Sequence, residues 1–472
     1  MNDERGRRDR AVWLVLFVLF LAANTAYLHR VPGLFGDEAS EGENVYQLLH
    51  KRRVTVVGER SYIGPLADYF RVPFVLVFGY TALPLRLLML VISIASFWLA
   101  AAVFRRMFGQ RAAALAVAAM FFSPAYLLYQ RLGWAITLFP FFGLLVLFWL
   151  TDRRTTLPTR SALAGLSAGL GLHNYIVFLP TLLAIGAGWL IVQLTGRGDS
   201  WRAKLRGILT WWLALVGFWA GFGSQFAVLQ LMREDQGRPL EVLALYGERL
   251  KLLPQALLHV ISGSAYAARY TGEAFSGPIQ MAIVTGLTAL ITLALLKSPR
   301  RGMSAVWLIG LLMQVLTLLV MIDHYTLRYM VVFVLGIWAL AGVGLSVLLK
   351  RGSWWPVVLA VCLIIWTAAT VLLPFLKTGG STKQYEIGGR MDRSADFVDI
   401  RGIVDCVRAI GPVWSDDPHI YNRLQYLSLG DKGVQLPLSI YEAHWIIEHR
   451  LPDQKPGVQC QELAHWRVLK RK

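Results

Sequence analysis

Four carboxylates lie within seven residues of this chain, although the chain as a whole is basic. Asp37, Glu38, Glu41 and Glu43 follow the first long apolar stretch, whereas the full sequence carries 47 Lys and Arg against 29 Asp and Glu. A carboxylate beside a substrate hydroxyl can take its proton in a general-base step. Asp37 and Glu38 are therefore the candidate catalytic residues, with Asp37 as the base. Both could instead cap a helix, because acidic side chains satisfy free N–H groups at a helix start.

Other polar residues stand at the ends of later apolar stretches. Guanidinium groups match phosphate oxygens in a bidentate geometry, so such arginines could hold an anionic headgroup. The candidate substrate-binding residues are Arg86, Arg131, His173, His324, Tyr325 and Arg328. Structural roles stay open for all of them, since interfacial arginines reach toward the membrane surface and histidines at helix ends are commonly hydrogen-bonded. No dense metal motif or phosphate-binding loop occurs, so no cofactor is expected, with a divalent metal kept as an alternative.

Membrane spans must position these residues. Hydrophobic residues make up 56% of the 472 and charged residues 16%, below the roughly 25% of soluble domains. The apolar residues form blocks of about 17 to 25, which is the length of a bilayer-spanning helix. We therefore predict an all-α polytopic membrane protein with about eleven spans. They cover residues 11–29, 82–104, 111–129, 132–150, 160–173, 175–195, 207–231, 276–296, 303–322, 327–349 and 354–375.

Every second short loop is basic, which is the bias of cytoplasmic loops in membrane proteins. These loops lie at 105–111, 153–160, 197–206, 297–301 and 350–351. The pattern predicts a cytoplasmic amino terminus and accounts for the net charge of +18 without nucleic-acid binding. The three long segments, 30–81, 232–275 and 376–472, then all face outside.

Amphipathic segments interrupt the outer loops. Residues 43–50 have apolar side chains at helical spacing, and residues 66–80 are apolar but short and broken by proline. Both suit helices that lie along the membrane surface. Residues 240–258 repeat this character in the second long loop.

The composition changes after the last predicted span. We divide the chain into a transmembrane domain 1–375, a linker 376–395 and a small extracytoplasmic α+β domain 396–472. In the last part we predict helices at 397–410 and 418–429 and strands at 412–415 and 465–469. Cys406 and Cys460 are candidates for a disulfide on the oxidising side of the membrane, and two unpaired thiols are the alternative.

In its motifs the chain resembles the GT-C membrane glycosyltransferases, especially the protein O-mannosyltransferases and lipid A aminoarabinose transferases. Asp37-Glu38 directly follows the first span, as an Asp-Glu pair does in that family. Arg328-Tyr329 at the head of a late span is similar to the Arg-Tyr element of the family. The pattern from Gly64-Pro65 through Leu85-Arg86-Leu87 to Ser123-Pro124 is also similar. The resemblance covers the layout of residues 10 to about 350.

The resemblance implies a sugar donor linked to polyprenyl phosphate and an acceptor hydroxyl or amine on a glycan, lipid or protein. The acceptor would attack the anomeric carbon with inversion, and Asp37 would take its proton. Arg86 and Arg328 would hold the charge of the departing phosphate, and Glu38 would orient Asp37 or bind the sugar. The family generally works without a catalytic metal. The implied location is the inner membrane of a bacterium, with membrane lipids as the surrounding partners.

Two other classes of function stay open. A transporter or lipid flippase predicts charged or Gly/Pro-broken positions at mid-span and internal two-fold symmetry. In this sequence the polar residues instead gather at one face of the membrane, which favours an enzyme. A non-catalytic membrane scaffold would have a dispensable Asp37.

Overall fold

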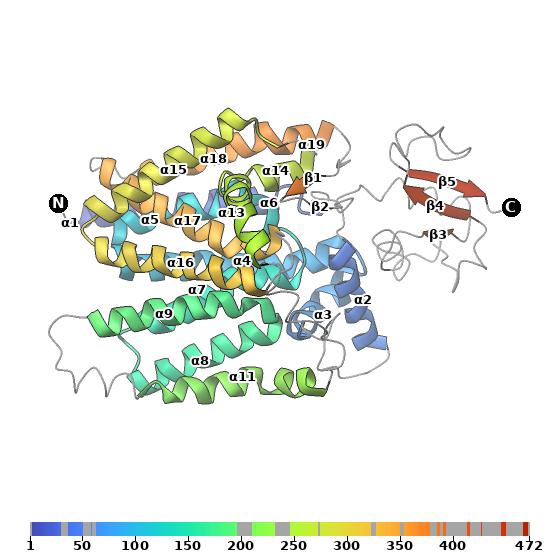
Figure 1. The fold of residues 1–472 in the computed structure, drawn as a ribbon, viewed down its shortest axis with the longest axis horizontal. Helices are drawn as coiled ribbons and strands as arrows, with labels where there is room; N and C mark the ends of the chain where they lie inside the picture. The colour runs from blue at the N-terminus through green and yellow to red at the C-terminus, as the bar shows by residue number, and fades with distance from the viewer. Residues whose placement is uncertain are drawn as a thin grey trace.

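The chain folds into a bundle of helices that run roughly side by side (Figure 1). The structure, a computed structural model, describes residues 2–29, 36–50, 58, 63–195, 210–231, 246–271, 274–321, 327–349, 354–377, 385–387, 390–392, 413–415, 426, 445–449 and 466–470. Within these residues, six helices are long and apolar enough to cross a bilayer. The architecture is that of a multi-pass helical membrane protein.

Each predicted span contains a helix. These helices are α1 (Asn2–Thr25), α4 (Ala82–Phe108), α5 (Gln110–Phe121), α7 (Phe139–Thr151), α8 (Leu157–Asn174), α9 (Leu179–Thr195), α11 (Trp212–Leu231), α15 (Gly277–Lys297), α16 (Arg301–Met321), α17 (Leu327–Leu348) and α18 (Trp355–Thr367). Only α4, α9 and α15 to α18 lie in the six segments that meet the length and hydropathy of a span. The number of eleven crossings therefore stays a prediction.

At one end of the bundle, prolines interrupt some of these helices or shift the residue at which they begin. The predicted span 111–129 breaks at Ser123, where the backbone is extended, and continues as the short α6 (Pro124–Tyr129). The break follows because proline disfavours a helical conformation in the residue before it. One-turn 3-10 helices, η1 (Ala135–Leu138) and η2 (Ile176–Phe178), lead into α7 and α9. Short irregular segments therefore replace regular helix at the end of the bundle where the polar residues meet.

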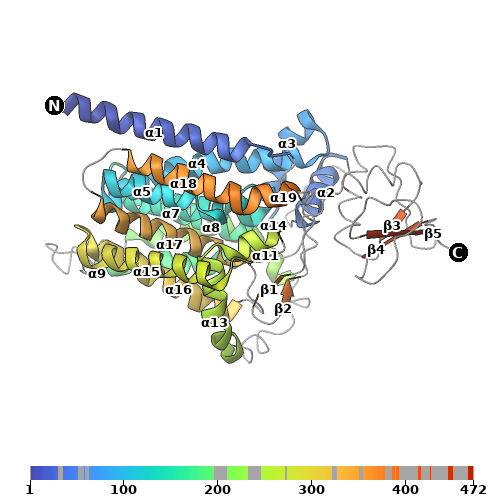
Figure 2. The same cartoon turned by 90° about the horizontal axis from the view of Figure 1, so that it is seen from above.

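Two helices of the first predicted outer loop lie across that end of the bundle, beyond the end of α1 that is distant from the amino terminus (Figures 1 and 2). They are α2 (Gly36–His50) and α3 (Leu66–Phe78), which pack against each other. The predicted helix 43–50 begins earlier, at Gly36, and Asp37 and Glu38 occupy its first turn, where carboxylates favour the helix dipole. In the second long loop, α13 (Tyr246–Ile261) and α14 (Ser264–Thr271) occupy most of the described residues.

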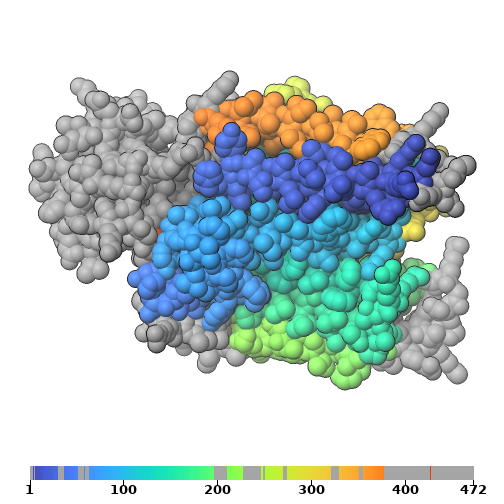
Figure 3. All heavy atoms as spheres, turned by 180° about the vertical axis from the view of Figure 1, so that it is seen from behind, coloured from blue at the N-terminus to red at the C-terminus, as the bar shows by residue number. Residues whose placement is uncertain are grey.

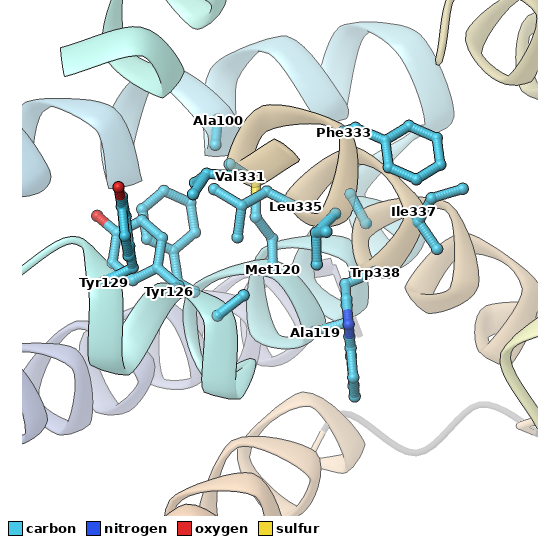
Figure 4. Packing of buried hydrophobic residues seen from close by; sticks show 14 of the residues in the cluster. Ala100, Ala119, Met120, Tyr126, Tyr129, Val331, Phe333, Leu335, Ile337 and Trp338 are labelled. Atoms are coloured by element: carbon cyan, nitrogen blue, oxygen red, sulfur yellow. The ribbon is translucent and has the colours of Figure 1, made fainter. Parts of the chain in front are cut away.

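Small residues allow the central helices to pack closely. α5 carries an alanine-rich sequence and packs against α17. Ala119 and Met120 of α5 lie beside Leu335 and Trp338 of α17 (Figure 4). Close helix contact through small residues is the usual packing mode inside membranes, where apolar burial gives no net drive. α1 runs along the outside of the bundle between α4 and α18, as the dark blue strip in Figure 3.

Three of the basic loops meet at the opposite end of the bundle. Arg106, at the end of α4, places Nη2 2.9 Å from Oδ1 of Asp152, which follows α7. Arg300, between α15 and α16, donates from Nη1 to the backbone oxygen of Arg106 at 2.5 Å. Loops that the charge pattern assigns to one side of the membrane therefore lie together.

The described residues of the carboxyl-terminal part include five short strands. β1 (Tyr385–Ile387) and β2 (Arg390–Asp392) form an antiparallel pair. In a second sheet, β4 (Trp445–His449) pairs in parallel with β3 (Val413–Ser415) and antiparallel with β5 (Trp466–Lys470). β3 and β5 agree with the two predicted strands. The predicted helices 397–410 and 418–429 lie outside the described residues, apart from Tyr426, as do Cys406 and Cys460. The domain division and the disulfide stay predictions.

Candidate active site

A buried ion pair joins the first turn of α2 to the start of α4. Glu38 and Arg86 are both fully buried, and their contact is bidentate, with Nε to Oε1 at 2.8 Å and Nη2 to Oε2 at 2.9 Å. Nη1 of Arg86 donates to the backbone oxygen of Leu28 at 2.9 Å. The pair therefore connects the end of α1, the acidic segment and the second predicted span.

Backbone N–H groups from the turn before α7 complete the cradle around the carboxylates. The N–H of Gly133 donates to Oε1 of Glu38 at 2.8 Å. The N–H of Ala135 lies 3.0 Å from both carboxylate oxygens of Glu41. A Cβ at residue 133 would stand 2.7 Å from Oε1 of Glu38, so only glycine allows this approach without displacement. The turn and the start of α2 are thus held against each other.

Glu41 shares a second buried cation with α3. Arg71 contacts Oε2 of Glu41 at 2.5 Å and Oδ1 of Asp68 at 2.8 Å, and all three side chains are buried. Asn44 donates to the other oxygen of Asp68 at 3.4 Å. One guanidinium cannot fully compensate two buried carboxylates. Burial accordingly raises the pKa of Asp68 to about 6, against the opposing effect of Arg71.

Asp37 and Glu43 are half-buried, whereas Glu38 and Glu41 are buried and held by arginines and backbone N–H groups. Since Asp37 precedes Glu38 in the same helical turn, the fixed position of Glu38 also restrains the backbone of Asp37. The arrangement holds the partly accessible carboxylate of Asp37 on a rigid support, which is what a positioned proton acceptor needs.

Several of the predicted substrate-binding residues also gather at this end. Arg86 uses Nε and both Nη groups within the ion pair and on Leu28, so a contact with a substrate phosphate would require it to exchange partners. Arg131 is buried, and its Nη2 donates to the backbone oxygen of Ala26 at the end of α1. The structure places both arginines beside the first predicted outer loop.

His173 lies at the end of α8, half-buried, with Nδ1 3.4 Å from Oγ of Ser224 in α11. The next residue, Asn174, donates from Nδ2 to the backbone oxygen of Ala135 at 2.8 Å. The hydroxyls of Tyr175 and Tyr329 are 3.3 Å apart, which brings the start of α17 to the same place. His324 and Tyr325 lie outside the described residues, and of Arg328 only the backbone, at the start of α17, is described.

Sequence reasoning did not single out Arg71, Asp68 or Tyr426. The spacing of Asp68 and Arg71, three residues apart in an apolar helix, is a signal that could have indicated a buried pair. Tyr426 carries no such signal. It is fully buried, its hydroxyl donates to the backbone oxygen of Thr81 at 3.0 Å, and its ring lies 6.1 Å from that of Tyr80. Burial, followed by the charge of Glu38, raises the pKa of Tyr426 above its usual value.

The described residues include no group of three or more His, Cys, Asp or Glu side chains arranged to hold a metal ion. Glu38 and Glu41 are engaged by arginines and backbone N–H groups, and Asp68 by Arg71 and Asn44.

The bundle, with two helices lying across one end, is similar in fold to solved structures of ArnT, as the resemblance to the GT-C membrane glycosyltransferases predicts. One of these structures is ArnT from Cupriavidus metallidurans bound to undecaprenyl phosphate. That structure is 14% identical, and the alignment covers 93% of this chain and 93% of that one with a TM-score of 0.57. ArnT in the apo state is 12% identical, with 94% and 92% covered and a TM-score of 0.54.

The archaeal oligosaccharyltransferase AglB from Archaeoglobus fulgidus aligns with 16% identity and a TM-score of 0.47, covering 94% of this chain and 62% of AglB. No protein-family model and no curated protein matches the sequence.

Proposed function

We propose that this protein transfers a sugar from a polyprenyl-phosphate donor to a hydroxyl or amine acceptor at the outer face of the membrane. The observation that carries the proposal is the placement of the half-buried Asp37 on a buried ionic scaffold, within a fold whose solved example, ArnT, is bound to undecaprenyl phosphate. The acceptor is a glycan, lipid or protein.

The proposed reaction is a single inverting displacement. The acceptor oxygen or nitrogen attacks the anomeric carbon, and Asp37 takes the proton that the acceptor loses. The bond between that carbon and the phosphate oxygen breaks, and polyprenyl phosphate leaves with the electron pair. Because phosphate is a good leaving group, the reaction needs cations that hold its charge rather than a general acid. Arg131 and Arg328 are the proposed phosphate ligands, with His173, His324 and Tyr325 as further substrate contacts.

For Glu38 and Arg86 the contacts favour a positioning role. Both carboxylate oxygens of Glu38 are held by Arg86. Glu38 would fix the first turn of α2 and with it the direction of Asp37, and Arg86 would act on the phosphate only after releasing Glu38. This assignment makes Arg86 a positioning residue in the resting protein and a phosphate ligand only after a change of partner.

The proposal includes an arrangement in the membrane. We infer eleven crossings, a cytoplasmic amino terminus and an extracytoplasmic domain 396–472, in a bacterial inner membrane. The meeting of the loops around Arg106, Asp152 and Arg300 at one end, away from α2, supports this sidedness. In a chain with its three cysteines replaced by serine, His50→Cys should react with an impermeant maleimide in intact cells. Arg153→Cys should not react, and the reverse pattern would invert the topology.

The experiment that tests the function compares surface glycans, glycolipids and glycoproteins of a deletion strain with its parent by mass spectrometry. A sugar lost from one acceptor class is expected. Wild-type protein and the matched control Glu43→Gln should restore it, whereas Asp37→Asn should not, at equal amounts of protein in the membrane. An unchanged set of glycans would reject the transferase in favour of a transporter or scaffold. Full restoration by Asp37→Asn would reject the base assignment alone.

A further inference from the structure

A large cavity extends from the basic end of the bundle toward the end that carries Glu38. It has a volume of about 1040 Å3 and is bounded by α4, α5, α7, α9, α16 and α17. On α4, Arg106 at the cavity follows Arg86 by twenty residues, a separation of about 30 Å along a helix. The basic edge of the cavity is therefore distant from Glu38, whereas Pro140 and Val332, which also line the cavity, lie within a few residues of Ala135 and Tyr329 at the candidate active site.

The interior of the cavity is apolar. Met120, Leu144, Ile185, Val306 and Leu311 are among the residues that line it. Its volume is at the upper end of the range, roughly 300–1,000 Å3, of sites that take drug-sized ligands. An apolar ligand part of considerable size therefore fits.

One edge of the same cavity is strongly basic. Among the described residues, five arginines line this edge against one carboxylate, that of Asp152. The arginines are Arg106, Arg153, Arg154, Arg160 and Arg300. Asp152 is already engaged, since it accepts from Arg106 at 2.9 Å and from the hydroxyl of Thr155. The side chains of Arg153 and Arg154 are exposed at this edge. The edge thus carries a net positive charge that a bound anion would neutralise.

Two buried donors that line the cavity lack a hydrogen-bond acceptor within the described part of the chain. They are Nε1 of Trp189 and Nε of Arg160. Unsatisfied buried donors are costly, by about 1–3 kcal/mol each. Neither nitrogen has accessible surface, so an oxygen atom of a ligand in the cavity would reach either one only if its side chain moved.

We propose that this cavity binds a phospholipid with an anionic headgroup, with the acyl chains along the apolar walls and the phosphate at the arginine edge. Charge complementarity favours an anionic lipid, because a neutral lipid would leave the five arginines with only the carboxylate of Asp152 to balance them among the described residues. Basic pockets between membrane helices are known to take such headgroups, and anionic lipids are enriched where the positively charged loops lie. The inference does not depend on the proposed transferase activity.

Lipid binding to the purified, delipidated protein, followed by native mass spectrometry, tests the proposal. The probes are dioleoyl-phosphatidylglycerol, dioleoyl-phosphatidylcholine and inorganic phosphate. Phosphatidylglycerol should bind at least about tenfold more tightly than phosphatidylcholine. The variant Arg153→Ala/Arg154→Ala should weaken its binding about fivefold for each arginine removed. Arg301→Ala is the matched control, since Arg301 is exposed beside Arg300 but does not line the cavity.

A second pair of variants tests the apolar part without changing charge. A Cβ at residue 143 would meet only Cγ2 of Thr181 at 3.6 Å and Cδ1 of Ile185 at 3.9 Å, so Gly143→Ala fits. Gly143→Leu would extend into the cavity and should reduce phosphatidylglycerol occupancy, whereas Gly143→Ala should not.

Three results would overturn the proposal. Equal binding of both lipids with no effect of the arginine variant would show a cavity filled by any lipid. Displacement of phosphatidylglycerol by inorganic phosphate at millimolar concentration would assign a small-anion site. Undiminished binding to Gly143→Leu, with its unfolding temperature retained, would place the acyl chains elsewhere.

Discussion

The Glu38–Arg86 pair offers the sharpest test of how the candidate site is held together. Both partners are fully buried, and Arg86 makes three hydrogen bonds through the pair and Leu28. Arg86→Met removes the cation but keeps an unbranched chain of similar length. It leaves Glu38 buried without this cation, while the N–H of Gly133 still donates to it.

The magnitude follows from the cost of a buried, uncompensated charge. Breaking one partner of a buried pair costs about 3–5 kcal/mol, whereas replacing both by apolar or neutral groups is often nearly neutral. Arg86→Met should therefore destabilise by about 3–5 kcal/mol. The double variant Glu38→Gln/Arg86→Met should recover most of that loss. At roughly 1 °C per kcal/mol for a chain of 472 residues, the single variant should lower the unfolding temperature by about 3–5 °C.

The assay is thermal unfolding of the purified protein in detergent, monitored by tryptophan fluorescence, for both single variants and the double variant. Arg105→Ala is the matched control, because Arg105 stands on the same helix and is exposed. Its Nε donates to the backbone oxygen of Ala101, and its guanidinium lies 5.7 Å from the ring of Trp13, which is a weak contact at an exposed site. Arg105→Ala should shift the unfolding temperature by less than about 2 °C. Additive losses in the double variant would refute the reasoning, since they would mean that the two side chains do not depend on each other.

Three further predictions concern the surroundings of the site. The pKa of Asp68 is raised to about 6, so the stability that its protonation contributes is complete below about pH 4 and is lost as the pH rises through about 6, by about 3 kcal/mol in total. Asp68→Asn should therefore flatten the decline of the unfolding temperature with pH, and an unchanged decline would contradict the raised pKa. Gly133→Ala should lower the unfolding temperature, because its Cβ would stand 2.7 Å from Oε1 of Glu38, whereas the Cβ of the control Gly286→Ala meets nothing within 4 Å. Equal effects of the two variants would contradict the close approach of Gly133 to Glu38. Tyr426→Ala should remove a fully buried ring, at a cost of about 3–5 kcal/mol, and expose the carboxyl-terminal part to limited proteolysis. Tyr426→Phe should lose only the hydrogen bond to Thr81, and identical cleavage of the wild type and both variants would contradict the packing of Tyr426.

The helices could be predicted because long apolar blocks in a membrane protein have few alternatives to helix. α4 and α17 are examples, each within a few residues of the predicted span. The break at Ser123 was harder to predict from the sequence, since proline is common in membrane helices and breaks only some of them. The gathering of the acidic segment with Arg86 and His173 at one end also follows from alternating spans, and the structure brings these residues to the same end.

Side-chain partners could not be predicted in the same way. Arg86 and Glu38 are 48 residues apart, and the sequence offered equal reason to pair Arg86 with a substrate phosphate. The contact of Arg71 with Glu41 depends on the angle at which α3 crosses α2, which no periodicity encodes. Tyr426 reaches Thr81 across 345 residues of chain, so its role is visible only in the folded protein.

The measurement that tests the central claim most directly is the rate of sugar transfer by purified Asp37→Asn protein. Membranes of the deletion strain supply both donor and unmodified acceptor, and Glu43→Gln serves as the control. Loss of a positioned general base should lower the rate about 10²–10⁴-fold while the unfolding temperature stays that of the wild type. A rate equal to that of the wild-type protein would contradict the assignment of Asp37 as the base.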